Sequence, residues 1–132
     1  DVYEMAGRLK DQDIEPEVII SSPATRALHT ALIFARTLDH PVNKIHLKDI
    51  FYHGNDQDVL EIIRTVPDDA DSIMIFGHNP TFTDLANHFL PEELDKLPTA
   101  GMAVIEFNTD SWQEIDPGSV SQTWVDYPKN KS

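Results

Sequence analysis

Short apolar runs alternate with longer amphipathic stretches along this chain, and no other feature restricts its possible folds as strongly. Residues 17–21 (EVIIS) and 72–76 (SIMIF) are short, rich in β-branched side chains and almost wholly apolar, as expected of strands covered on both faces. Residues 23–38 and 56–66 carry apolar side chains at helical spacing. Strands separated by helices of this length predict βαβ units and a parallel sheet.

The other elements complete a three-layer α/β/α fold with a mostly parallel sheet. We expect the most hydrophobic run, 72–76, to be a central strand. We also expect a single α/β domain over 1–127 and a frayed tail over 128–132. The pattern predicts two more helices and three more strands, the last two strands forming an antiparallel pair: helices over 1–11 and 81–90, and strands over 44–50, 102–108 and 120–126.

Two of the predicted helices begin directly after a strand, and both starts carry capping signals. Ser22 followed by Pro23 predicts an N-cap and a first helical residue for the helix over 23–38. Thr81 with Asp84 three residues later predicts a capping box for the helix over 81–90. The carboxyl ends of the two strands are therefore placed beside helix N-termini, where open α/β sheets bind ligands.

Composition excludes several classes of function. The chain has 132 residues, a net charge of -13 and no cysteine, so it can build one core but no disulfide, thiolate zinc site or thiol nucleophile. The histidine spacing does not suggest a metal site. The acidic balance argues against nucleic-acid binding, and no apolar run approaches the ~20 residues of a membrane span. We therefore expect a cytoplasmic protein that holds any anionic substrate in a local positive pocket.

Arg26 and His78 are the candidate functional residues at these two junctions. Arg26 lies in the first turn of its helix, where free N–H groups and a guanidinium together favour a phosphate. His78 directly follows the most apolar strand and can donate to a phosphoryl oxygen when it is protonated. The alternatives are a surface ion pair for Arg26 and a core imidazole bonded to a backbone carbonyl for His78. Parallel strands ending near each other would bring the two residues into one pocket.

The motifs at 21–27 (SSPATRA) and 77–80 (GHNP) resemble those of the histidine phosphatase superfamily, which has the phosphoglycerate-mutase-like fold. The short length and the segment 98–101 (PTAG) are similar to its SixA-type phosphohistidine phosphatases. The resemblance implies a hydrolase without metal or organic cofactor, in which a first histidine becomes transiently phosphorylated. It also implies that Arg26 binds the phosphate and that His78 lines the same pocket and stabilises the transferred charge.

The sequence departs from this family pattern in two respects. No arginine is followed by histidine, so the nucleophile and the first strand of the family are missing from the chain. We expect that they precede Asp1, and that the chain alone is inactive and unstable, because a sheet lacking an interior strand exposes unpaired backbone groups. The proton-donating glutamate of larger relatives also has no clear match, and the candidates for a general acid are Asp49, His53 and Asp56.

Three functions remain open at this point. The first is a phosphatase in which Arg26 and His78 are catalytic and Ser22 and Asn79 bind substrate. Its substrate would be a phosphorylated protein, such as a histidine-phosphotransfer domain, or a small phosphorylated molecule such as a phosphoester. The second is a catalytically inactive module that binds phosphate or a phosphoprotein, and the third is a structural α/β domain. The sequence does not specify the oligomeric state.

Overall fold

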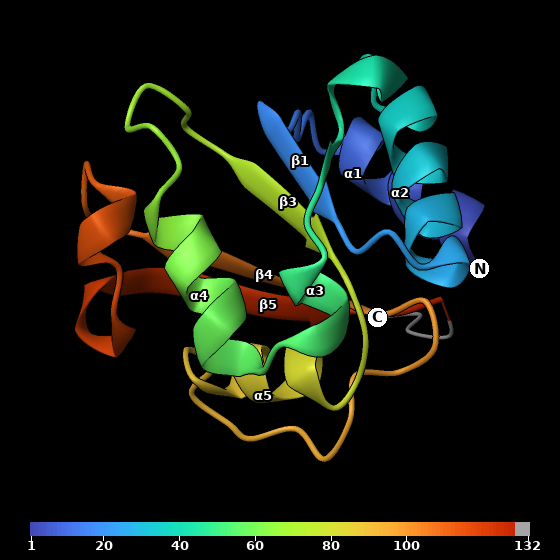
Figure 1. Cartoon of the computed structure of the whole chain (residues 1–132). Helices are drawn as coiled ribbons and strands as arrows, with labels where there is room; N and C mark the ends of the chain where they lie inside the picture. The colour runs from blue at the N-terminus through green and yellow to red at the C-terminus, as the bar shows by residue number, and fades with distance from the viewer. Residues whose placement is uncertain (129–132) are drawn as a thin grey trace.

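The computed structural model describes residues 1–128 and confirms the α/β fold class (Figure 1). Residues 129–132, which hold most of the predicted tail, lie outside the described residues. The strands are β1 Val18–Ser21, β2 His46–Leu47, β3 Ile73–Phe76, β4 Met102–Phe107 and β5 Val120–Asp126. The α-helices are α1 Val2–Asp11, α2 Thr25–Thr37, α3 Ile50–His53, α4 Asp56–Arg64 and α5 Thr81–Asn87, and the 3₁₀ helices are η1 Val42–Lys44, η2 Trp112–Glu114 and η3 Pro117–Ser119.

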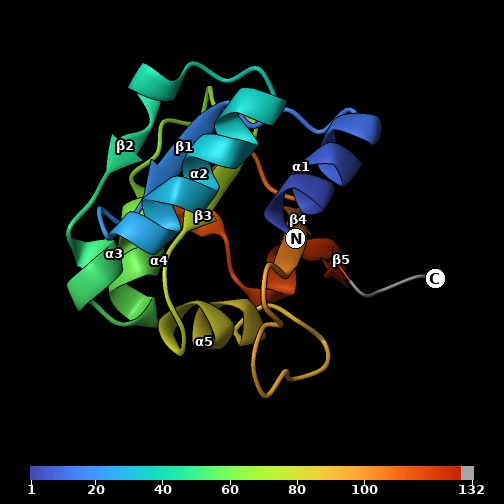
Figure 2. The ribbon, with the colours of Figure 1, turned by 90° about the vertical axis from the view of Figure 1, so that its right-hand side faces the viewer.

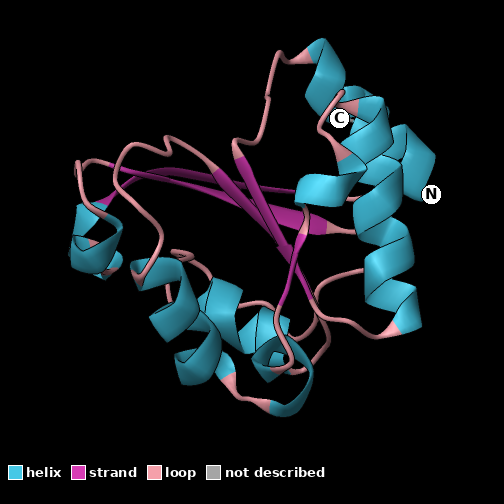
Figure 3. Cartoon of the chain, turned by 45° about the horizontal axis from the view of Figure 1, so that its top comes forward, coloured by secondary structure: helices cyan, strands magenta, loops and turns pink. Residues whose placement is uncertain are grey.

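The five described strands form two sheets. β2, β1 and β3 lie side by side in that order and run parallel, whereas β4 and β5 form a separate antiparallel pair. Figure 3 shows these strands in the middle of the molecule with helices on both sides. The prediction that 72–76 is the central strand is wrong for this sheet, because β1 occupies the middle and β3 lies at an edge with half-buried side chains.

Helices cover both faces of the parallel sheet. Neighbouring residues of β1 point to opposite faces, so each face presents apolar side chains that a helix covers. Ile19 packs against Ala31 and Ala35 of α2, and α1 adds further apolar side chains on this face. Ile20 belongs to the largest cluster of buried residues, which includes Phe51 of α3 and Leu60 of α4. Figure 2 shows α1 and α2 on one side of the sheet and α4 on the other. The predicted three-layer arrangement is thus present.

The start of α2 differs from its sequence prediction. The helix begins at Thr25, and Ala24 occupies the N-cap position without a side-chain hydrogen bond. Ser22 remains part of the strand ladder instead, since its backbone N–H donates to the carbonyl of Phe76 at 2.9 Å. Its hydroxyl accepts from the Ala24 N–H at 3.2 Å, so it supports the turn that precedes the helix.

Two further predictions about local structure are wrong. The strand predicted over 44–50 is only two residues long, and the helix α3 follows it. The capping box predicted for α5 is absent, since Pro80 is the N-cap residue. A capping box occurs instead on α4, where Asn55 and Asp58 exchange hydrogen bonds.

Arg8 joins α1 to the end of β5. Its guanidinium donates to Asp126 at 2.7 Å and to the carbonyl of Tyr127 at 3.1 Å, and it also pairs with Glu4. The hydrogen bond to Asp126 raises the pKa of Arg8 above its ordinary value, because it favours the charged guanidinium. Within residues 1–128, no helix is both long and apolar enough to span a bilayer.

Candidate functional site

The carboxyl ends of β1 and β3 lie side by side and define the candidate site. The two strands pair in parallel with Ser21 opposite Phe76, and the Ser22 N–H continues the ladder by one residue. The segments that leave the two strands therefore start from adjacent points of the same sheet edge. In Figure 2 the start of α2, the helix α3 and the segment between β3 and α5 gather at this end of the sheet.

Ser22 and His78 form the central contact of the site. The Nε2 atom of His78 lies 2.9 Å from the Ser22 hydroxyl oxygen, a good hydrogen-bond distance. Ser22 is fully buried and His78 is half-buried, so the contact joins a fixed side chain to one that solvent still reaches. A hydroxyl can accept from a protonated Nε2 or donate to a deprotonated one, and it can therefore hold the imidazole in either state.

Arg26 lies four residues after Ser22, as the second residue of α2, and its side chain is exposed. No ion pair involves it within residues 1–128, so the surface ion pair that sequence analysis offered as the alternative does not form there. An exposed guanidinium in the first turn of a helix is able to bind an anion without first breaking an ion pair. Its role in binding phosphate stays a prediction.

One aromatic side chain of α3, Tyr52, lies beside His78, and it was not among the residues predicted for the site. The ring of Tyr52 meets the imidazole of His78 edge-on at a centroid distance of 5.3 Å. The same ring meets His53 at 4.7 Å, which places this candidate general acid next to the site through Tyr52. The run of Phe51, Tyr52 and His53 before a glycine was the available signal. Tyr52 was not predicted because residues 51–55 lie between the strand predicted over 44–50 and the helix predicted over 56–66.

Gly77 has a steric reason to be glycine. A Cβ atom at this position would lie 2.2 Å from Cε1 of Phe82, which is far inside van der Waals contact. Its backbone is not in the left-handed region, so space and not conformational freedom is what the position requires. The ring of Phe82 packs edge-on against Phe51 at 5.8 Å. This pair of core rings therefore lies against Gly77, the residue directly before His78.

Asn79 serves the fold in the first place. Its Oδ1 atom accepts from the backbone N–H of Thr83 at 3.2 Å and from the Thr83 hydroxyl at 2.7 Å. These bonds satisfy donors at the start of α5, which has no cap from Pro80. Its predicted contact with substrate stays a prediction, since the carbonyl oxygen of its side chain is already used inside the chain.

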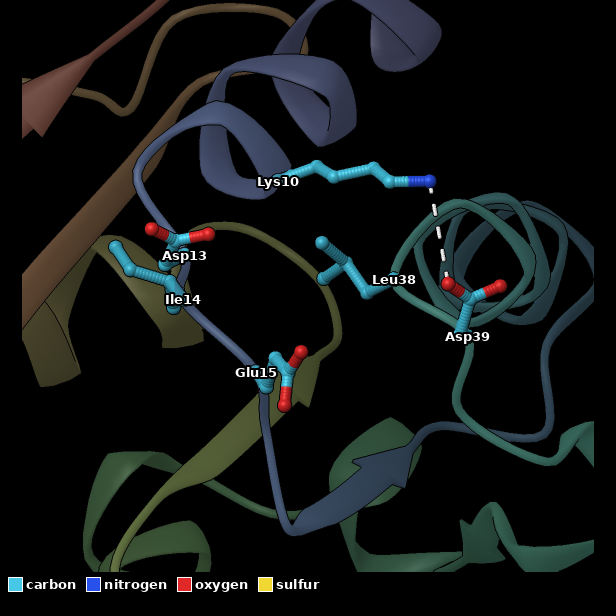
Figure 4. A pocket seen from close by; sticks show the side chains of 6 residues that line it. All are labelled: Lys10, Asp13, Ile14, Glu15, Leu38 and Asp39. Carbon is cyan, nitrogen blue, oxygen red and sulfur yellow. Dashed lines mark ion pairs between the residues drawn. The ribbon is translucent and has the colours of Figure 1, made fainter.

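A separate pocket of about 150 Å³ lies at the opposite end of β1 (Figure 4). Lys10, Asp13, Ile14, Glu15, Leu38 and Asp39 line it. Lys10 is its only cation, and its Nζ atom lies 3.9 Å from Asp39. Three carboxylates against one partnered lysine disfavour a phosphate, so this pocket is not a second candidate for an oxyanion. Among residues 1–128 there is also no group of three or more histidine or acidic side chains that could hold a metal ion.

The structure thus defines an α/β protein with a buried serine and a histidine joined at the carboxyl edge of a parallel sheet, and an arginine in the next helical turn. Solved structures share this architecture. The protein described as phosphohistidine phosphatase SixA from Nakamurella multipartitia superposes with a TM-score of 0.78 at 18% identity, covering 98% of this chain and 80% of its own. The corresponding protein from Agrobacterium tumefaciens gives 0.69 at 26% identity, covering 80% and 70%.

A third structure, the protein histidine phosphatase SixA complexed with tungstate, gives a TM-score of 0.72 at 19% identity and covers 96% of this chain and 76% of its own. No protein-family model matches the sequence, and no curated protein does. The chain therefore has the fold of the SixA-type histidine phosphatases, as its two motifs predicted.

Proposed function

We propose that this chain supplies most of a phosphatase that removes a phosphoryl group from phosphohistidine in a protein, or from a small phosphorylated molecule. The observation that carries the proposal is the 2.9 Å contact between Ser22 and His78, because it joins the two sequence motifs in one place. The shared fold with SixA-type phosphatases supports the same reaction class, and one of those proteins was solved with tungstate, a tetrahedral oxyanion.

In this proposal Arg26 and His78 act on the transferred phosphoryl group. The nucleophilic imidazole attacks phosphorus while the bond from phosphorus to the substrate nitrogen or oxygen breaks, and the leaving atom takes a proton. Water then attacks the phosphohistidine of the enzyme and releases inorganic phosphate. Charge spreads over the three equatorial oxygens in both steps, and a guanidinium with a protonated imidazole stabilises it. Ser22 orients His78. The candidate proton donors are Asp49, His53 and Asp56.

We infer that the nucleophile of the proposed reaction lies on a strand outside these 132 residues. No arginine in the sequence is followed by histidine. Within the described residues, β3 pairs only with β1 and β4 pairs only with β5, so each of them keeps one edge without a strand partner. We place the missing strand beside β3, where its carboxyl end would face His78. A free edge favours this because an added strand satisfies its backbone groups.

The second candidate function is a phosphate-binding module without catalysis. The absence of an Arg-His dipeptide favours it, since a chain that acts alone would lack the nucleophile. Both candidates use the same site, and they differ in whether the bound oxyanion is turned over.

Phosphate release by the full-length protein distinguishes the candidates. Release from a phosphohistidine protein, together with an acid-labile phosphoenzyme, supports the phosphatase. Binding of tungstate without turnover supports the phosphate-binding module. If the protein shows no binding and no turnover, the remaining candidate is a structural domain.

Arginine variants test the site itself. Arg26→Ala should lower turnover by about 10²–10³-fold, the usual loss for one charge-stabilising donor. Arg36→Ala is the matched control, since it removes an exposed arginine from the last turn of the same helix. Both variants should keep their free energy of unfolding within about 1 kcal/mol. Equal activity losses in the two variants would remove Arg26 from the site.

A further inference from the structure

Charge is distributed unevenly along this acidic chain. Residues 18–48 contain one acidic side chain, Asp39, whereas the rest of the sequence holds 22 of the 23 acidic residues. The same stretch carries four exposed basic side chains, and none of them forms an ion pair within residues 1–128: Arg26, Arg36, Lys44 and Lys48. This stretch therefore carries a net positive charge in a protein whose net charge is -13, and the next acidic residue along the chain is the exposed Asp49.

Exposed apolar side chains gather in the second half of this region and just beyond it. We call residues 42–53 the β2 edge, because they form η1, the outer strand β2 and the helix α3. Every residue from 41 to 50 except Ile45 is exposed. Four of the five large apolar side chains that are exposed among residues 1–128 lie here, and Tyr3 is the fifth: Val42 at 42%, Leu47 at 50%, Ile50 at 37% and Tyr52 at 56%.

The β2 edge is continuous with the candidate site. The ring of Tyr52 packs edge-on against the imidazole of His78, with 5.3 Å between the ring centroids. The last part of this surface therefore forms the rim of the site. The backbone N–H of Lys48 donates to the carbonyl of Ser21 at 3.1 Å, which fixes the lysine next to the residue before Ser22. Figure 2 shows β2 and α3 beside α2, the helix that carries Arg26.

We propose that the β2 edge is the docking surface for a partner protein whose own surface is acidic around an apolar contact and which carries the phosphoryl group. Exposed apolar side chains interleaved with unpaired lysines fit such a surface, since apolar contact supplies affinity and opposite charge steers the encounter. A small phosphorylated molecule would reach His78 without covering Val42 or Leu47. This proposal rests on the proposed phosphatase function and adds the surface that recognises the protein substrate.

A matched pair of triple variants of the full-length protein tests the docking surface. The first, Lys44→Gln with Leu47→Ser and Lys48→Gln, removes two lysines and one exposed apolar side chain from the β2 edge. The control, Lys10→Gln with Lys96→Gln and Tyr3→Ser, removes two lysines and one exposed large apolar side chain elsewhere and changes the net charge equally. Both are assayed on a histidine-phosphotransfer domain phosphorylated with phosphoramidate, and on phosphoramidate itself.

The first variant should lower kcat/KM for the phosphorylated domain by about tenfold or more and leave hydrolysis of phosphoramidate within about twofold of its original rate. The control should change neither. Added salt should weaken the reaction of the unmodified protein with the domain more than that of the first variant, because exposed charges are screened. An unchanged kcat/KM for the domain, or an equal loss on both substrates, would overturn the docking proposal.

An NMR titration of the unmodified protein with the phosphorylated domain keeps the two proposals separable. Amide shifts that change mainly over residues 42–53 support the docking surface even if neither substrate is hydrolysed, an outcome that would count against the phosphatase alone. Shifts that change mainly elsewhere on the protein, or no binding, would refute the docking surface whatever the activity.

Discussion

Replacing Gly77 by alanine should destabilise the protein through one defined clash. The added Cβ would lie 2.2 Å from Cε1 and 2.4 Å from Cζ of Phe82, so the ring has to move by more than an ångström to restore contact distance. Phe82 packs on Phe51, which is 1% exposed, and the displacement therefore spreads into the core. Overpacking of this kind costs about 1–3 kcal/mol of the free energy of unfolding.

The same substitution at Gly7 provides the control. No atom outside its chain neighbours and helix backbone lies within 4 Å of a Cβ built at Gly7, and the residue is inside α1. Alanine should therefore stabilise the helix by about 0.5–1 kcal/mol, because it loses less backbone entropy than glycine. In urea unfolding followed by circular dichroism, the midpoint should be lower for Gly77→Ala and higher for Gly7→Ala than for the unmodified protein.

A second substitution at Phe82 identifies the cause of the loss. In a Phe82→Leu background the ring atoms that meet the new Cβ are gone, so Gly77→Ala should cost less there than in the unmodified protein. The expected coupling energy between the two sites is about 0.5–3 kcal/mol. The steric reasoning is refuted if Gly77→Ala costs under about 0.5 kcal/mol, or if its cost is the same in both backgrounds.

Two further predictions concern Ser22 and Arg8. Ser22→Ala removes a buried hydroxyl that contacts His78 and the Ala24 N–H. It should lower the free energy of unfolding by about 1–2 kcal/mol in urea and shift the imidazole resonances of His78. Unchanged resonances would mean that the serine does not orient the ring. Arg8→Ala should speed amide hydrogen exchange at the end of β5, because Arg8 pairs with Asp126. Lys10→Ala should leave this exchange unchanged, because Lys10 lies 3.9 Å from its partner Asp39 and both side chains are exposed. Equal exchange rates in the two variants would contradict this.

The buried elements were predictable because burial leaves a pattern in the sequence. Ile19 and Ile20 are both buried, on opposite faces of β1, and a strand covered on both sides has to be apolar at consecutive positions. The helices α1, α2 and α4 each bury one stripe, so their 3.6-residue period was visible. Boundaries were less predictable. Ser22 has the composition of an N-cap, but its backbone is held in the ladder by Phe76.

The β2 edge was poorly predicted for the opposite reason. Ile45 and Leu47 alternate like residues of a half-buried strand, yet Leu47 is 50% exposed and the strand has only two residues. In α3 only Phe51 is buried, and a helix of one turn has too few positions to show a period. Tyr52 was therefore missed although it contacts His78. Segments that bury little leave little pattern, and part of the rim of this site is made of such a segment.

The register of β1 on β3 ties the core to the site. Ile19 lies opposite Met74 and Ile20 opposite Ile75, and each pair packs on its own face of the sheet. A slip of one residue would move β1 by about 3.3 Å and turn every side chain to the other face. Such a slip would disrupt both hydrophobic clusters. It would also break the 2.9 Å contact between Ser22 and His78, because the shift is larger than the contact distance. The alternation of buried side chains therefore fixes the contact on which the proposed chemistry depends.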